Sequence, residues 1–156
     1  MKRSKNFDLI VFDWDGTLWC GHQRRLFDGV ASLLARLQAR GHRLAVATAM
    51  RRDDLDRALV HLGLDGVFDG SRTTDQTQDK PHPCMLLELM NELAAPPART
   101  LMVGDTPRDL QMAQNAGCAS LGVSYSGTLP DLMLRYQPRY VASSVAELDQ
   151  WLAGNA

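Results

Sequence analysis

Short apolar runs alternate with helix-length amphipathic segments along this chain of 156 residues. The alternation predicts an α/β fold, and we expect a Rossmann-like three-layer α/β/α sandwich with a mostly parallel sheet. Strands are expected over Asp8–Phe12, Arg43–Ala47, Val67–Phe68, Thr100–Val103 and Ala119–Val123, with Tyr140–Val141 as an edge strand. Helices are expected over Gly29–Arg40, Arg52–Leu62, Pro83–Leu93, Pro107–Gly117 and Val145–Leu152. The polar stretch Gly70–Lys80 is interpreted as an ordered loop.

Length and composition narrow the functional classes. The length suits one domain with a single core, so we expect residues 1–156 to form one domain. A net charge of −1 gives no field that favours nucleic acid or an anionic membrane, and no apolar stretch has transmembrane length. Cys20, Cys84 and Cys118 match no zinc or disulfide framework. Because no long apolar segment follows the basic N-terminus, we expect no signal peptide and a cytoplasmic location.

Polar side chains stand where the expected strands end. Asp13 and Asp15 follow the first strand on a sharp turn, Thr48 follows the second, and Asp105 follows the strand that ends at position 103. Lys80 lies in a loop before a helix. Open parallel sheets bind ligands outside the carboxyl ends of their strands, so we expect these groups to converge. One carboxylate there can attack an electrophile while a second moves a proton.

Each of these residues also has a simpler structural interpretation. The acidic pair could form an Asx turn, and Thr48 could cap the helix that follows it. Lys80 could be a solvated loop residue, and Asp105 and Asp109 could cap and charge the start of a helix. Gly104 is expected to shape a turn. The joint occurrence of the set, rather than any one member, favours a functional site.

Four motifs in this order carry a resemblance to a known family. They are Val11–Leu18, Ala47–Ala49, Asp79–Pro83 and Val103–Asp109, which together span most of the chain. With them the chain resembles the haloacid-dehalogenase-like hydrolase superfamily, and within it the phosphoglycolate-phosphatase-like branch. The resemblance implies a Mg²⁺-dependent phosphatase that hydrolyses a phosphomonoester on a haloacid-dehalogenase-type core.

The resemblance also implies a role for each matching residue. Asp13 would be the nucleophile that forms an aspartyl-phosphate, and Asp15 the general acid that later activates water. Thr48 and the backbone N–H of Ala49 would hold the phosphoryl group. Lys80 would neutralise Asp13 and the phosphate oxygens.

The implied cofactor is Mg²⁺, a hard cation that prefers oxygen ligands. The ligands would be Asp13, Asp15 through its backbone carbonyl, and Asp105, while Asp109 would support either the metal or Lys80. Four carboxylates in one pocket repel one another unless a cation is present, which is an independent physical reason to expect one. The family's dehalogenases are metal-free and lack this acid set, so the set favours phosphoryl transfer over carbon–halogen cleavage.

The main departure from the branch is a missing cap. Its members usually carry a helical cap domain after the first motif, where this chain has only Trp19–Phe27 before the next expected helix. No cap fits between Thr48 and Lys80 either. We therefore expect an open site. The substrate could be large, a neighbouring subunit in a homo-oligomer could cover the site, or activity could be broad and weak.

A short segment after the first motif is the expected flap over the site. Within it Trp19, His22, Arg24 and Arg25 could contact substrate, and Arg51 could add positive potential beside the phosphate site. The plain alternative is a solvated turn with Trp19 packed on the core. Arg51 could equally belong to a solvated helix start.

These expectations make a phosphorylated small molecule or macromolecule the partner. A membrane is excluded, and nucleic acid is disfavoured except through a phosphorylated end. Two rival functions share the scaffold. One is a non-catalytic or regulatory interaction protein, which the complete acid set argues against. The other is a phosphotransferase or mutase, whose transfer reaction competes poorly with hydrolysis when no cap excludes water.

Overall fold

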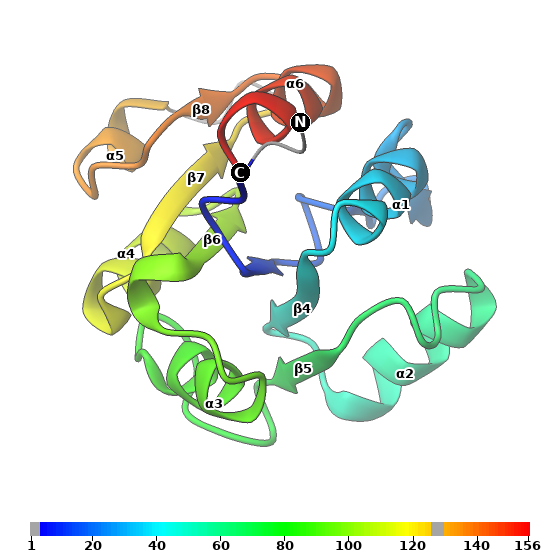
Figure 1. The fold of residues 1–156 in the computed structure, drawn as a ribbon. Helices are drawn as coiled ribbons and strands as arrows, with labels where there is room; N and C mark the ends of the chain where they lie inside the picture. Colours follow the sequence, from blue (N-terminus) through cyan, green and yellow to red (C-terminus); the bar gives the residue numbers. More distant parts are fainter. Residues whose placement is uncertain (1–3, 126–129) are drawn as a thin grey trace.

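A computed structural model describes residues 4–125 and 130–156 of the chain. In these residues a parallel six-stranded sheet has the strand order β5-β4-β1-β6-β7-β8 (Figure 1). Its strands are β1 Leu9–Phe12, β4 Arg43–Thr48, β5 Gly70–Thr73, β6 Thr100–Gly104, β7 Ala119–Val123 and β8 Val141–Ala142. A separate antiparallel hairpin consists of β2 Trp19–Cys20 and β3 Arg25–Leu26. The helices are α1 Val30–Ala39, α2 Arg52–His61, α3 Cys84–Glu92, α4 Pro107–Ala116, α5 Pro130–Leu134 and α6 Val145–Asn155, with a 3₁₀ turn at Pro97–Arg99.

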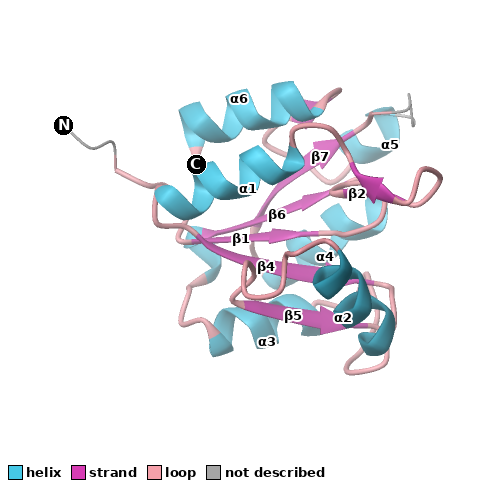
Figure 2. Ribbon diagram, turned by 90° about the vertical axis from the view of Figure 1, so that its right-hand side faces the viewer, coloured by secondary structure: helices cyan, strands magenta, loops and turns pink. Residues whose placement is uncertain are grey.

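Helices cover both faces of the sheet, as the sandwich prediction requires. Ile10 and Phe12 of β1 pack with residues of α1, α2 and α6, while Leu9 and Val11 pack with residues of α3 and α4. Figure 2 shows α1 and α6 on one side of the strands and α3 and α4 on the other. All four β1 residues are fully buried, as a strand covered on both faces must be. The predicted three-layer α/β/α architecture is confirmed.

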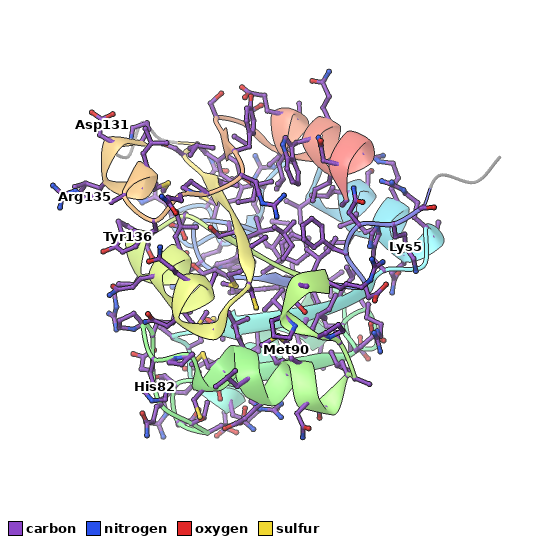
Figure 3. The ribbon with its side chains drawn as sticks, turned by 60° about the vertical axis from the view of Figure 1, so that its left-hand side comes forward. Lys5, His82, Met90, Asp131, Arg135 and Tyr136 are labelled. Carbon is purple, nitrogen blue, oxygen red and sulfur yellow. The ribbon has the colours of Figure 1, made fainter. Side chains whose placement is uncertain are left out.

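Side-chain direction follows these layers. Met90 lies on the face of α3 that is turned toward the sheet and is buried. Asp131 of α5 and Arg135, which follows α5, extend outward and are exposed (Figure 3).

Helix α4 is capped at its C-terminal end by Gly117, which has a φ of 77°. Glycine adopts this left-handed conformation without the penalty that a Cβ imposes, so it is the usual helix stop.

The expected elements hold with three corrections. The prediction of a strand at Val67–Phe68 is wrong: Val67 lies in a turn, and the strand is β5, the first part of the stretch expected to be a loop. Phe68 is apolar for a different reason, since its ring packs edge-on against Trp14 with 6.5 Å between centroids. The last strand begins at Val141 rather than one residue earlier, and neither the β2–β3 hairpin nor α5 was expected as an element.

Three further statements concern the chain outside the sheet. In the described ranges, no helix is both long and apolar enough to cross a membrane. Residues 1–3, with the basic Lys2 and Arg3 on which part of the signal-peptide expectation rests, lie outside the described residues. All three cysteines are free thiols.

Candidate active site

The carboxyl ends of three neighbouring strands meet at the centre of the sheet. β1 lies between β4 and β6, where the strand order changes direction, and open α/β sheets bind ligands at such a point. Asp13 follows β1, Thr48 ends β4 and Asp105 follows β6. They line a cavity of about 430 Å³ together with Asp15, Ala49, Met50, Asp79, Lys80, Thr106, Arg108 and Asp109. The structure thus brings together every residue predicted to be catalytic, phosphate-binding or metal-ligating, although their roles stay predictions.

Lys80 holds two buried carboxylates. Its Nζ lies 2.9 Å from Asp13 Oδ1 and 2.6 Å from Asp109 Oδ1, and the lysine side chain is only 6% exposed. Burial alone would lower the pKa of Lys80, but the charges of Asp109 and Asp13 outweigh it and raise that pKa above its usual value. Lys80 therefore stays protonated, which contradicts the alternative of a solvated loop lysine.

The carboxylates carry more negative charge than one lysine can balance. Burial raises the pKa of Asp13 to about 6, against the opposing charge of Lys80. Burial, followed by the charge of Asp13, raises the pKa of Asp109 to about 6. Burial also raises the pKa of Asp105. Each raised pKa means that the ionised carboxylate is less favourable in this site than in water.

Three of these acids could hold a metal ion. Asp13, Asp105 and Asp109 each offer a carboxylate oxygen, and the three oxygens lie within 4.8 Å of one another. Buried, all-oxygen, negatively charged donors fit a hard divalent cation, which would relieve their mutual repulsion. The Asp15 carboxylate is not part of this cluster, and its predicted contact through the backbone carbonyl stays a prediction. Gly16 makes room for Asp105, because a Cβ there would lie 2.1 Å from Asp105 Oδ2.

Comparison with known proteins identifies this arrangement. Residues 20–123 match the family model described as haloacid dehalogenase-like hydrolase. The chain belongs to the haloacid dehalogenase-like hydrolase family. The predicted resemblance is thereby confirmed.

Its relatives in sequence are longer proteins. The chain is 37% identical over 124 residues to the probable phosphatase IndB of Dickeya dadantii, covering 79% of this chain and 54% of IndB. It is 32% identical over 130 residues to a phosphoglycolate phosphatase of Vibrio vulnificus, covering 82% and 57%. It is 32% identical over 123 residues to the pyrophosphatase PpaX of Halalkalibacterium halodurans, covering 78% and 57%. The chain therefore spans little more than half the length of these relatives.

Solved structures share the fold over their whole length. A predicted phosphoglycolate phosphatase from Haemophilus somnus aligns with a TM-score of 0.82 at 21% identity, covering 94% of this chain and 98% of that one. A predicted phosphatase from Clostridium acetobutylicum aligns with a TM-score of 0.83 at 18% identity, covering 95% and 99%. At these identities the likeness shows the α/β fold alone.

Thr48 is not a helix cap. It is the last residue of β4, it is buried, and its Oγ1 accepts a hydrogen bond of 3.1 Å from the Met50 backbone N–H. The residue at the cap position of α2 is Arg51, so the capping alternative for Thr48 is wrong. Thr48 and the exposed Ala49 instead line the cavity.

Asp109 both caps helix α4 and pairs with Lys80 in the cavity. Its Oδ2 accepts from the Thr106 backbone N–H at 3.2 Å, while the Thr106 hydroxyl accepts from the Asp109 N–H, which makes a capping box at the start of α4. Its Oδ1 pairs with Lys80. Gly104 allows this approach, because a Cβ there would lie 2.3 Å from Asp109 Cβ. The expectation that Gly104 is a turn residue is wrong, since it ends β6.

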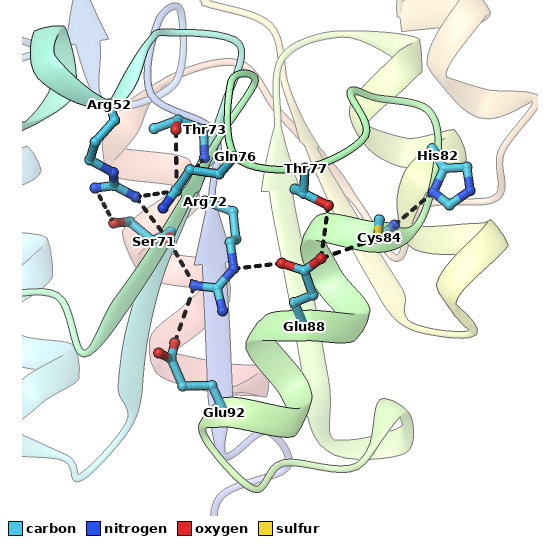
Figure 4. A network of polar contacts seen from close by, with 10 residues as sticks. All are labelled: Arg52, Ser71, Arg72, Thr73, Gln76, Thr77, His82, Cys84, Glu88 and Glu92. Atoms are coloured by element: carbon cyan, nitrogen blue, oxygen red, sulfur yellow. Dashed lines mark hydrogen bonds and ion pairs between the residues drawn. The ribbon is translucent and has the colours of Figure 1, made fainter.

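A polar network connects the loop that carries Lys80 to the edge strand β5 and to the neighbouring helices (Figure 4). Arg72 of β5 pairs with Glu88 of α3 at 2.9 Å, and Thr77 in the loop donates to the same glutamate at 2.8 Å. Arg52 at the start of α2 donates to Gln76 at 2.6 Å. The network ties the loop to both neighbouring helices and so limits how far Lys80 can move.

The predicted substrate contacts divide into two groups. Trp19 and His22 line a second cavity, beside the first. Arg24, Arg25 and Arg51 are exposed and line neither of these two cavities. Arg25 instead lies 3.5 Å from Asp28.

Sequence reasoning missed two residues of the site. Arg108 lines the first cavity, and its guanidinium contacts the Lys80 carbonyl oxygen and lies 3.7 Å from Asp79. Thr17 is fully buried and donates to Asp105 Oδ1 at 3.2 Å. Both lie within the motifs that carry the resemblance, so position within a motif could have found them.

Proposed function

We propose that this chain is a Mg²⁺-dependent phosphatase that hydrolyses a phosphomonoester through an aspartyl-phosphate on Asp13. The observation that carries the proposal is the buried Asp13 carboxylate, which Lys80 holds at 2.9 Å beside Asp105 and Asp109. Relatives named as phosphatases and a pyrophosphatase support the reaction class.

The geometry orients the nucleophile before substrate arrives. Asp13 Oδ1 accepts hydrogen bonds from Lys80 Nζ at 2.9 Å and from the Trp14 backbone N–H at 2.8 Å. A fixed carboxylate loses little freedom when it attacks phosphorus. Lys80, the Thr48 hydroxyl and the Ala49 N–H would bind the phosphoryl oxygens and stabilise their charge in the transition state.

Asp15 would act first as the general acid and then as the general base. As Asp13 attacks phosphorus and the bond to the leaving oxygen breaks, Asp15 gives that oxygen its proton. Asp15 then takes a proton from water, which attacks phosphorus, releases phosphate and restores the Asp13 carboxylate. Bound Mg²⁺ would neutralise charge on the phosphoryl group and the nucleophile. Asp13, Asp105 and the Asp15 carbonyl would hold it, and Asp109 would act through Lys80.

We further propose that the chain is one domain with an open site and no cap. The places where caps would stand hold the β2–β3 hairpin and the segment with α2 and β5. A cytoplasmic location, and cover by a neighbouring subunit, stay predictions.

Hydrolysis of an aryl phosphate with and without Mg²⁺ tests the proposal. We expect turnover by the wild type with Mg²⁺, and a loss of more than about 10³-fold on chelation or in Asp13→Asn. Asp53→Asn, at an exposed acid in the first turn of α2, is the matched control and keeps its activity. Equal rates in all samples would contradict the enzyme. A folded protein that is inert toward many phosphomonoesters would favour the interaction protein, and transfer to an added alcohol in preference to water would favour the phosphotransferase.

A further inference from the structure

A second cavity lies beside the hairpin and meets the first cavity at two acids. Its volume is about 290 Å³, and Asp15 and Asp105 line both cavities. Its remaining walls come from the hairpin, from Phe27 after it and from Tyr125 after β7. Figure 2 places the β2 strand of this hairpin near the ends of β6 and β7. Nothing in the proposed chemistry of Asp13 and Lys80 uses this space.

Three aromatic side chains dominate the second cavity, and packing fixes their rings. Phe27 and Tyr125 contact each other edge to face, with 4.9 Å between centroids. Trp19 stacks on the fully buried Trp14, with 6.1 Å between centroids and 15° between planes. Rings that are already held in place lose little freedom when a flat ligand packs against them.

Tyr125 adds an unused polar group. Its hydroxyl oxygen is buried and has no hydrogen-bond partner within the described ranges. Burial, followed by the charge of Asp105, raises the pKa of Tyr125, so its proton stays on the oxygen. Buried hydroxyls usually have a partner, and this one is unsatisfied in a residue that lines the second cavity.

The Asp15 carboxylate faces the hairpin. A Cβ on Gly21, in the hairpin turn, would lie 3.0 Å from Asp15 Oδ1, so the carboxylate stands beside the turn that lines the second cavity. The oxygen that Asp15 protonates belongs to the leaving group. A leaving group in contact with Asp15 is therefore next to the second cavity.

Size and charge limit what the second cavity can accept. A cavity of about 150 Å³ can hold a benzene ring, so 290 Å³ is ample for one ring and its substituents. Asp15, Asp105 and His22 line it without lysine or arginine, whereas Lys80 and Arg108 line the first cavity. The negatively charged phosphoryl group is therefore expected in the first cavity, beside these cations.

We propose that the second cavity binds the leaving group of the phosphomonoester, and that this group carries an aromatic ring. The proposal rests on the proposed phosphatase function. The phosphoryl group lies with Lys80 and Thr48 in the first cavity, and the ring lies against Trp19 and Phe27. Hydrolysis breaks the bond between phosphorus and the leaving oxygen, which receives the proton of Asp15, and water supplies the oxygen that replaces it.

Benzyl phosphate and propyl phosphate test the ring specificity, because both are esters of primary alcohols and differ mainly in the ring. We expect kcat/KM to favour benzyl phosphate by about tenfold in the wild type. Phe27→Leu, which keeps an apolar side chain but removes the ring, abolishes the preference. Phe68→Leu is the matched control, since Phe68 is a partly buried ring that lines neither cavity, and it keeps the preference. Circular dichroism spectra and melting temperatures close to those of the wild type show that both variants are folded.

Binding of benzylphosphonate and propylphosphonate, measured by calorimetry, separates this proposal from the phosphatase proposal. We expect benzylphosphonate to bind about tenfold more tightly to the wild type and equally to Phe27→Leu. Equal affinities in the wild type, or a preference for phosphoglycolate over benzyl phosphate, would overturn the aromatic site. Tighter binding of benzylphosphonate without turnover of either ester would instead overturn the phosphatase function and leave the ring site standing.

Discussion

The two cavities that meet at Asp15 are built from different parts of the chain and differ in character. The first is formed by strand ends and the loops that directly follow them, and it is charged: Lys80 lies between Asp13 and Asp109. The second is formed by a short hairpin and two neighbouring rings, and it is aromatic. We infer from the difference that the strand ends supply the reaction and that the hairpin region supplies the selection of substrate. Changes in the two cavities should therefore have separable effects.

The largest expected effect is the loss of Lys80. Lys80→Met leaves Asp13 and Asp109 buried without their cation, so we expect kcat to fall by at least about 10²-fold. The free energy of unfolding should fall by about 3 kcal/mol near pH 8, because breaking a buried pair leaves uncompensated charge. The loss should be smaller near pH 5, where the acids bind protons. Urea denaturation measures it, and Lys5→Met, at a residue that donates to the Gly41 carbonyl near the surface, should change stability little.

Gly104→Ala should damage the charged cavity through packing. The new Cβ would lie 2.3 Å from Asp109 Cβ, so β6 and α4 must move apart, at a cost of about 1–3 kcal/mol in unfolding free energy. Activity should fall with it, because Asp109 holds Lys80. Gly154→Ala is the matched control, since it has nothing within 4 Å in α6 and should be neutral or slightly stabilising. Equal melting temperatures for the two variants would contradict the account.

Metal and pH should act together on the same cavity. Burial raises the pKa of Asp13 and that of Asp109 to about 6, from 3.8 for a solvated aspartate, so the folded state binds more protons than the unfolded state between about pH 4 and 6. Without divalent cation, the free energy of unfolding should therefore fall as pH rises through that window. Added Mg²⁺ should raise the melting temperature more near pH 8 than near pH 5, because protons compete for its ligand oxygens. The same shift at both pH values would argue against Asp13 as a ligand.

The smallest effect tests the boundary between the cavities. Gly21 does not have a positive φ, so Gly21→Ala is compatible with the backbone, but its Cβ would press on Asp15 at 3.0 Å. We expect kcat to fall roughly threefold to tenfold for propyl phosphate, whose leaving oxygen needs a proton. The decrease should be smaller for an aryl phosphate, whose leaving group departs without one. Equal decreases for both substrates would show that Asp15 is not the group disturbed.

Sequence patterns predicted the charged cavity well because parallel strands bring their carboxyl ends to one edge. Asp13, Thr48 and Asp105 could be placed there from strand boundaries alone. Strand β5 was not predicted because it is an edge strand and lacks an apolar pattern. Side-chain contacts of Ser71 and Arg72 stabilise it instead.

Contacts between distant segments account for the other omissions. The role of Gly104 depends on how closely α4 approaches β6, which no local pattern records. The second cavity combines Trp19 and Phe27 with Tyr125, which is about a hundred residues away in the chain. Such a site becomes visible only when the fold is known.

Covalent capture on Asp13 tests the central claim most directly. In Asp15→Asn an aryl phosphate can still phosphorylate Asp13, because its leaving group needs no proton, whereas the water that removes the phosphoryl group is no longer activated. Acid quenching and mass spectrometry should therefore find a phosphoryl group on the peptide that contains Asp13, with one equivalent of aryl alcohol released per protein. Continued turnover with no phosphorylated Asp13 would contradict the account.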